Sequence, residues 1–178
     1  MYLKTFVMNY DFVTFTFFND SLFMRIGFGF DVHQLVENMP FTLGGVVIPH
    51  QKGAIGHSDA DVLIHAICDA LLGASNLGDI GLHFPDSDPA LKGIDSKILL
   101  KKVVALMAQK GYRIINIDTT VCLQQPKLRP YIPQMKEILA QVMDISLDNI
   151  SIKATTTEKL GFTGREEGVA AYATVLIS

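Results

Sequence analysis

Hydrophobic residues alternate with other residues in several short runs, as in β-strands that bury one face. The run from Met24 to His33 is rich in Phe and Gly, and its Gly27 and Gly29 predict close approach of another backbone segment. Further extended segments are expected at residues 46–49, 112–123, 150–154 and 169–177. In the second of these, one face should carry Ile115, Ile117, Val121 and Leu123.

Residues 61–72 have the periodicity of a helix. Ser58 and Asp59 offer N-cap oxygens, and Gly73 stands where a C-terminal cap is expected. The residues expected to face the core are Val62, Leu63, Ile67 and Leu71.

Two later segments also predict helices. One begins after an N-cap at Asp95, runs to Lys110 and is closed by Gly111. The other follows the turn at 124–127 and holds the apolar residues Met135, Ile138, Leu139 and Val142. Because strands alternate with helices, we expect an α/β or α+β fold in which helices cover one sheet. Residues 76–89, rich in Gly, Asp and Pro, are expected to be irregular and exposed.

Composition limits the class of protein. The chain has 178 residues, of which 49% are hydrophobic, enough for one compact domain. The net charge of -3 excludes a global positive field that would attract nucleic acid or an anionic membrane. Cys68 and Cys122 form neither a CxxC pair nor a disulfide framework, so we expect a cytoplasmic protein.

The first 23 residues differ from the rest. They hold six of the eleven phenylalanines, but Asp11 and Asp20 interrupt them, and no basic segment or small-residue cleavage site is present. This composition does not fit a signal peptide or a transit peptide, and the chain has no apolar run long enough to span a membrane. We therefore interpret residues 1–23 as an extension of unknown role or a misplaced translation start, and residues 24–178 as the domain.

Asp31 and His33 are two residues apart on a predicted strand, so both side chains leave the same face. With His65 from the first predicted helix, they supply one carboxylate and two imidazoles, the ligand set of a catalytic zinc site. A D-x-H pair alone is more often structural. However, Asp61, His65 and Asp69 form one polar stripe at i, i+4 and i+8.

That stripe could simply be a solvated helix face. Just before it, His57, Ser58 and free backbone N–H groups at the positive end of the helix predict a phosphate-binding corner. The concentration of such groups within a dozen residues favours a functional site.

Three hydroxyls and a carboxylate follow the predicted strand 150–154, in the run Thr155-Thr156-Thr157-Glu158. They could hold phosphate oxygens and a hard cation such as Mg²⁺, although a capped turn at a strand end would have the same residues. Lys127 could offset phosphate charge or be a solvated turn residue. His50 and His83 are interpreted as surface or packing residues, and Cys68 as a buried one.

Together these segments resemble the cyclodiphosphate synthase family from residue 24 to the C-terminus. The motifs that carry the resemblance, in family order, are Asp31-Val32-His33, His57-Ser58-Asp59-Ala60-Asp61 with His65, Gly78-Asp79-Ile80-Gly81, the run Phe84-Pro85-Asp86-Ser87-Asp88-Pro89, and Lys153 through Arg165. The resemblance implies a mixed sheet with helices packed on one side, assembled as a homotrimer with active sites between subunits.

The resemblance also implies a reaction: 4-diphosphocytidyl-2-C-methyl-D-erythritol 2-phosphate is cyclised to 2-C-methyl-D-erythritol 2,4-cyclodiphosphate with release of CMP, in the non-mevalonate isoprenoid pathway. Asp31, His33 and His65 would ligate zinc, and Glu158 would ligate Mg²⁺ or Mn²⁺. His57 and Thr156 would stabilise the transition state.

The substrate contacts that the resemblance implies come from seven groups of residues along the chain. Leu123 to Arg129 would belong to the neighbouring subunit, and Phe162 and Arg165 would lie near the trimer axis, where the family can bind an isoprenoid diphosphate. The full set is Asp31, Val32, His33, His57, Ser58, Asp79, Ile80, Gly81, Phe84, Pro85, Asp86, Ser87, Asp88, Leu123, Gln124, Gln125, Pro126, Lys127, Leu128, Arg129, Thr155, Thr156, Thr157, Glu158, Phe162 and Arg165.

Three positions depart from the family pattern. Phe28 replaces a frequent histidine, which we expect to change packing beside the zinc ligands, and His83 and Arg129 flank binding stretches. Two other functions stay open from the residues alone. A metallophosphohydrolase would release linear phosphate products, and a trimeric nucleotide- or isoprenoid-diphosphate-binding module would leave the metal ligands unoccupied.

Overall fold

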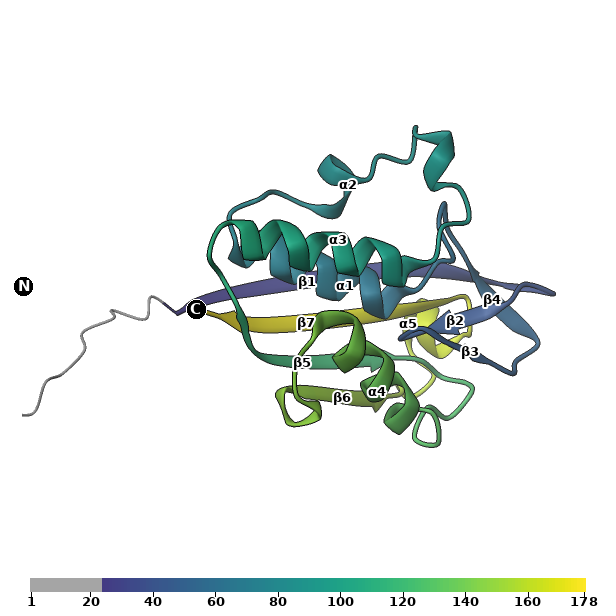
Figure 1. Ribbon diagram of the computed structural model, residues 1–178. Coiled ribbons are helices and arrows are strands. Elements are labelled where there is room, and N and C mark those ends of the chain that lie inside the picture. Colours follow the sequence, from purple (N-terminus) through teal and green to yellow (C-terminus); the bar gives the residue numbers. More distant parts are fainter. Residues whose placement is uncertain (1–23) are drawn as a thin grey trace, which may run out of the picture.

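The structure, a computed structural model, describes residues 24–178; the predicted extension at residues 1–23 lies outside it. Its larger sheet has five strands in the order β4-β1-β7-β5-β6 (Figure 1). β5 and β6 are parallel and the other neighbours antiparallel, so the predicted mixed sheet is confirmed. The strands are β1 (Arg25–Glu37), β2 (Phe41–Leu43), β3 (Val46–Ile48), β4 (Lys52–Ile55), β5 (Ile114–Cys122), β6 (Ile150–Thr155) and β7 (Gly168–Ile177), of which β2 and β3 form a separate hairpin.

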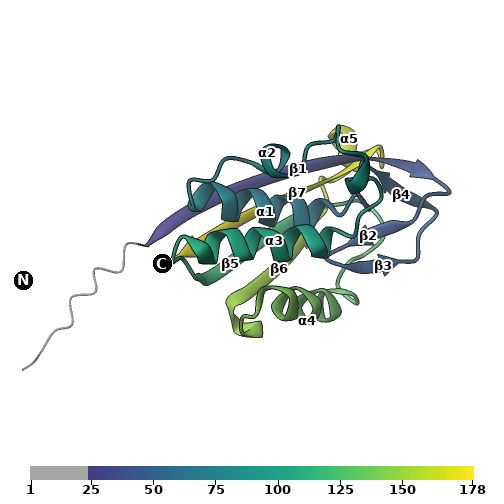
Figure 2. The ribbon, with the colours of Figure 1, turned by 45° about the horizontal axis from the view of Figure 1, so that its top comes forward.

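Helices cover one face of this sheet, as predicted (Figures 1 and 2). The three long ones are α1 (Val62–Ala74), α3 (Ser96–Gln109) and α4 (Ile132–Met143). α1 packs on β1 and β7, α3 packs on α1, and α4 contacts β6. The short elements are α2 (Ile80–His83), α5 (Gly161–Gly164), and the 3₁₀ turns η1 (Pro89–Leu91) and η2 (Leu147–Asn149).

The first helix was predicted at the right place with the wrong caps. Its N-cap is Asp61, whose side chain accepts from Ile64 N, rather than Ser58 or Asp59. Gly73 lies inside the helix, which ends at a C-cap on Ser75. The helix continues past Gly73 because α1 as a whole is packed between the sheet and α3. This tertiary packing outweighs the tendency of a glycine to end a helix.

β1 and α1 lie close together, as Gly27 and Gly29 predict. A Cβ added at Gly27 would lie 1.9 Å from the carbonyl oxygen of Ala70 in α1. The glycines therefore let the helix backbone rest directly on the strand.

Two further expectations need correction. Ile115 does not share the buried face of β5, because a register shift between Ile114 and Asn116 makes Ile114 the buried residue at that end of the strand. Residues 76–89 are exposed or half-buried as expected, but they include the short helix α2, capped by Asp79. The expected cap of α3 at Asp95 is confirmed.

The face of β1 away from the helices carries apolar side chains. Ile26, Phe28, Phe30 and Val32 are all exposed there, and the rings of Phe28 and Phe30 lie 6.5 and 5.0 Å from that of Tyr172 on β7. The expectation that Phe28 packs beside the metal ligands is therefore wrong: even-numbered residues of β1 point away from the helix layer.

Candidate active site

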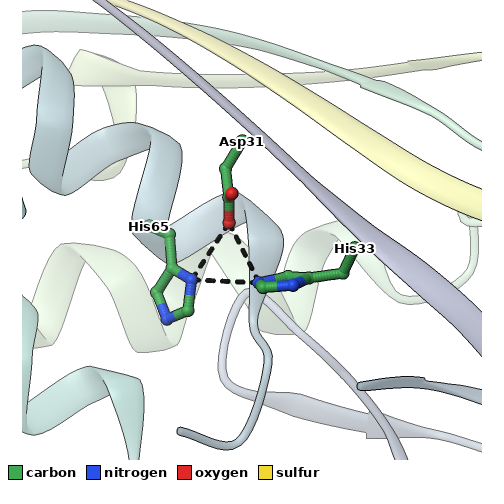
Figure 3. A group of neighbouring side chains, drawn as sticks. All are labelled: Asp31, His33 and His65. Atoms are coloured by element: carbon green, nitrogen blue, oxygen red, sulfur yellow. Dashed lines mark hydrogen bonds and ion pairs between the residues drawn. The ribbon is translucent and has the colours of Figure 1, made fainter. Parts of the chain in front are cut away.

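The predicted metal ligands converge on one point (Figure 3). Asp31 and His33 extend from β1, and His65 reaches them from α1. Asp31 Oδ2 lies 3.0 Å from both His33 Nε2 and His65 Nδ1, and the two ring nitrogens are 3.2 Å apart. Three ligand atoms from two elements thus form a nearly equilateral triangle.

The triangle fits a zinc ion. Ligands about 2.0–2.1 Å from a tetrahedral ion lie about 3.3 Å from one another, close to the spacings seen here. Three protein ligands leave the fourth position for a substrate oxygen or water, as in catalytic zinc sites. One cation bound by all three residues would require both ring nitrogens to face the same carboxylate oxygen, as they do here.

Charge within the cluster shifts two pKa values. Burial alone would raise the pKa of Asp31, but hydrogen bonds to His33 and His65 and their charges lower it to about 2. Burial would lower the pKa of His65, but the Asp31 carboxylate, with Asp61 and Asp59, raises it above its ordinary value of 6.5. The Asp31 carboxylate is therefore ionised throughout the neutral range, and it favours the positively charged form of the neighbouring His65.

The other nitrogen of His65 faces a second group of side chains. His65 Nε2 lies 2.9 Å from Ser96 Oγ, at the first residue of α3, and 3.0 Å from Ser58 Oγ. Ser96 in turn donates its hydroxyl proton to Asp59 Oδ1, and its backbone N–H donates to Asp59 Oδ2 at 3.1 Å. Sequence reasoning missed Ser96, because a serine after Asp95 has the appearance of an ordinary helix start.

Asp61 is fully buried, so the polar stripe of α1 is not a solvated face. Its carboxylate accepts hydrogen bonds from Gly44 N at 2.9 Å, Gly45 N at 2.7 Å and Ile64 N at 3.1 Å. This side chain joins the β2–β3 turn to the start of α1. Asp69, one turn beyond His65, is half-buried and accepts from Ile80 N at 2.8 Å, which fixes the start of α2.

The predicted phosphate-binding corner offers fewer free N–H groups than expected. The N–H groups of Asp59, Ala60 and Asp61 were expected to be free, but they donate to Ile94 O, Ser58 Oγ and Asp59 Oδ1. His57 is half-buried, and its carbonyl oxygen accepts from Gly93 N at 2.8 Å. The imidazole of His57, eight residues before the predicted ligand His65, is the main group that this corner offers a phosphate.

The run after β6 forms a tight turn. Thr156 Oγ1 donates to Glu158 Oε1 at 2.6 Å, while Thr155 and Thr157 donate to the carbonyl oxygens of Thr156 and Leu160. Glu158 has a φ of 52°, in the left-handed region. The hydroxyls of Thr155 and Thr157 thus stabilise the turn through backbone carbonyl oxygens, whereas the Thr156 hydroxyl is hydrogen-bonded to the Glu158 carboxylate.

The loop that carries the predicted substrate contacts from Asp79 to Asp88 is held by two short caps. Asp79 accepts from Leu82 N at 2.9 Å and Asp88 from Ala90 N at 2.9 Å. Phe84 lines a cavity of about 310 Å³ between this loop and α3, with Lys102 5.8 Å from its ring. The neighbouring positions Ile80, Gly81, Pro85, Asp86 and Ser87 are half-buried or exposed.

Residues 123–129 form the turn between β5 and α4, with a cis peptide bond at Gln125-Pro126. Leu123 and Leu128 are buried in the core, so their side chains support the turn. Lys127 and Arg129 are exposed. Val32, also a predicted contact, points to the sheet face opposite Asp31, and its N–H donates to Asp31 Oδ1 at 2.8 Å.

Four further residues behave as packing or surface groups. His83 bonds Leu77 O through Nε2 at 2.8 Å, and the ring of His50 lies 6.3 Å from that of Phe41, so both fit the predicted packing role. Cys68 is buried, as expected. Arg165 forms two hydrogen bonds of 2.9 Å with Glu167.

A mixed sheet covered by helices, with an Asp-His-His cluster that could hold a metal ion, defines an α/β protein with a candidate metal site. The chain belongs to the YgbB family, whose sequence model matches residues 24–178. A relative from Bacteroides fragilis, named 2-C-methyl-D-erythritol 2,4-cyclodiphosphate synthase, is 66% identical over 155 residues, 87% of this chain and 98% of the relative. The predicted family membership is confirmed.

Solved structures agree with this assignment. The bifunctional IspDF from Campylobacter jejuni matches with a TM-score of 0.84 and 45% identity, over 86% of this chain and 42% of that one. A CDP-bound 2C-methyl-D-erythritol-2,4-cyclodiphosphate synthase matches with a TM-score of 0.80 and 38% identity, over 86% of this chain and all of that one. Within residues 24–178, no helix is both long enough and apolar enough to cross a membrane.

Proposed function

We propose that this protein cyclises 4-diphosphocytidyl-2-C-methyl-D-erythritol 2-phosphate to 2-C-methyl-D-erythritol 2,4-cyclodiphosphate and releases CMP, as a phosphorus–oxygen lyase of isoprenoid precursor synthesis. The observation that carries the proposal is the convergence of Asp31, His33 and His65 in a chain 66% identical to a synthase of that name. The CDP-bound relative supports a cytidine diphosphate ligand.

Two cations serve this reaction. Asp31, His33 and His65 would hold zinc, and Glu158 would hold Mg²⁺ or Mn²⁺. Such cations would supply polarisation of a phosphate oxygen and charge neutralisation for the leaving CMP. Glu158 suits a hard cation because it is exposed at the end of β6, with the Thr156 hydroxyl 2.6 Å away.

The residues around the cations hold two phosphates in line. The 2-phosphate and the diphosphate belong to one molecule and repel each other, so catalysis depends on orientation and on donors placed where charge develops. His57 would hold the 2-phosphate, and Thr155 to Glu158 the diphosphate. Asp79 to Gly81 would contact the ribose, and Phe84 to Asp88 the methylerythritol.

A homotrimer completes each site. The exposed apolar row of Ile26, Phe28, Phe30 and Val32 on β1 would be buried against other copies of the chain, removing apolar surface from water. Residues 123–129 of one subunit, with Lys127, would then reach the nucleotide bound by its neighbour. Phe162 and Arg165 would face the trimer axis and an isoprenoid diphosphate there, with Arg165 leaving its pairing with Glu167 to bind phosphate. We expect this assembly in the cytoplasm, where the free thiols of Cys68 and Cys122 stay reduced.

The experiment that tests the function is turnover of the cytidyl substrate with Mg²⁺, followed by phosphorus NMR with and without a chelator. Cyclic diphosphate and CMP, both lost on chelation, are the expected result. Linear phosphate products would instead identify a hydrolase, and tight nucleotide binding without turnover would identify a binding module.

A further inference from the structure

His65 contributes its Nδ1 atom to the metal cluster, because that atom faces Asp31 Oδ2 and His33 Nε2 (Figure 3). Neutral imidazole carries its proton on one of the two nitrogens, and the protonated nitrogen cannot be a ligand. The chain must therefore keep the proton on Nε2 whenever His65 ligates an ion.

Ser96 has the contacts to do this. Its hydroxyl has one proton, which it donates to Asp59 Oδ1, so its oxygen can only accept from His65 Nε2, 2.9 Å away. Asp59 secures the serine twice, since its other oxygen accepts from Ser96 N at 3.1 Å. Ser96 is fully buried, so water does not compete for these bonds.

Ser58 also lies near His65 Nε2, but we expect it to control the position of the His65 proton less than Ser96 does. Its Oγ lies 3.0 Å from His65 Nε2 and accepts from Ala60 N at 3.2 Å, and it is 3.3 Å from Ser96 Oγ. No hydrogen bond joins the Ser58 hydroxyl to Asp59 in the described part of the chain, so the direction of its proton is not fixed by a carboxylate.

We propose that Ser96, oriented by Asp59, is a positioning residue that keeps the proton of His65 on Nε2 and so presents the Nδ1 lone pair to the metal. The proposal rests on the zinc site of the proposed function and adds to it a tautomer-setting relay from α3 to α1. Partners of this kind orient metal-bound histidines and typically change metal affinity 10- to 100-fold.

Nitrogen-15 NMR of the zinc-loaded protein tests the relay directly. We expect the His65 Nε2–H proton to give a resolved signal that exchanges slowly with water in the wild type, and Ser96→Ala to lose that protection. A wild-type His65 Nε2–H proton that exchanges as fast as that of an exposed imidazole would overturn the proposal. This readout needs no substrate, so it stands apart from the fate of the proposed reaction.

Zinc affinity, measured by competition with a chromophoric chelator, gives the second readout. Ser96→Ala should weaken zinc roughly 10- to 100-fold, and Ser58→Ala, the matched loss of a hydroxyl near the same nitrogen, by roughly threefold or less. Thermal unfolding of the metal-free variants checks that each folds. A folded Ser96→Ala protein that binds zinc as tightly as wild type would refute the relay, whereas a wild type that binds no zinc would refute the metal assignment itself.

Discussion

Gly29 on β1 and Ala66 on α1 are in backbone contact: a Cβ added at Gly29 would lie 1.9 Å from the carbonyl oxygen of Ala66. Ala66 follows His65 in the chain, and Gly29 precedes Asp31 by two residues. The contact therefore sets the distance between the two elements that supply the metal ligands. The absence of a side chain at Gly29 therefore lets α1 approach β1 closely enough for the ligand atoms of both elements to meet.

We predict that Gly29→Ala weakens zinc binding at least tenfold and lowers the free energy of unfolding by about 1–3 kcal/mol, because a backbone oxygen cannot rotate out of the way of the new methyl group. The matched control is Gly73→Ala in α1, where an added Cβ meets nothing within 4 Å. That change should stabilise by about 0.5–1 kcal/mol and leave zinc binding unchanged. Equal zinc affinities in the two variants, by chelator competition, would contradict the prediction.

Asp61→Ala should destabilise the protein by about 3 kcal/mol or more, since it leaves the N–H groups of Gly44, Gly45 and Ile64 without their acceptor in a buried site. Asp95→Ala is the control, because the Asp95 side chain accepts from only one backbone N–H at the start of α3, that of Lys97 at 2.9 Å, and is more exposed. Its expected cost is about 1 kcal/mol. Urea unfolding of both variants measures the difference, and similar losses would argue against the three-bond role of Asp61.

Phe30→Glu should prevent assembly, because it places a charge in the apolar row that the trimer would bury. Sedimentation should give a mass near the 19.6 kDa of one chain for this variant, and about three times that for wild type. Val47→Glu on β3, also at an exposed apolar residue but outside the row, should remain trimeric. A trimeric Phe30→Glu protein would show that another surface mediates association.

Mixed trimers test whether sites are shared between subunits. His65→Ala should largely abolish turnover, and Lys127→Ala should mainly raise KM. When the two variants are unfolded, mixed equally and refolded, about a quarter of the sites should combine an intact His65 with an intact Lys127 from the neighbour. Activity at low substrate should then exceed that of either variant refolded alone. No gain on mixing would place Lys127 in the same subunit's site, or outside the site.

Zinc should stabilise the protein more at pH 8 than at pH 6. The raised pKa of His65 gives the metal-free protein stability that is fully present below about pH 6.5 and is lost as pH rises through the raised pKa. Zinc must displace that proton, so its affinity falls as pH falls, while Asp31, with a pKa of about 2, stays ionised at both values. Calorimetric Tm values with and without zinc measure this, and a zinc-induced shift equal at both pH values would contradict it.

Local patterns predicted much of this structure. Alternation located β1, the Asp95 cap located α3, and the two-residue spacing of Asp31 and His33 put both ligands on one face. What local patterns could not predict came from packing. Asp61 became the cap because the β2–β3 turn covers it, and the register shift near Ile115 depends on pairing with β7.

In the site, too, local patterns predicted some features, and others depended on packing. Ligand types and spacing predicted the metal cluster, but the contact of Ser96 with His65 joins residues 31 positions apart and depends on how α3 crosses α1. Phe28 was misplaced for a simpler reason: it is next to a glycine of the ligand-bearing face, and adjacent strand residues point in opposite directions.

Strand β1 has two faces with separate tasks, metal ligands toward α1 and an apolar row toward the open side of the sheet. Because side chains alternate along a strand, inserting one residue ahead of Asp31 would reverse both tasks from that point on. Ligands would turn to the open side and Val32 would turn toward α1. The register of this strand therefore controls both faces at once, so substitutions can change the ligand face and the apolar face separately, whereas an insertion or deletion would disturb both together.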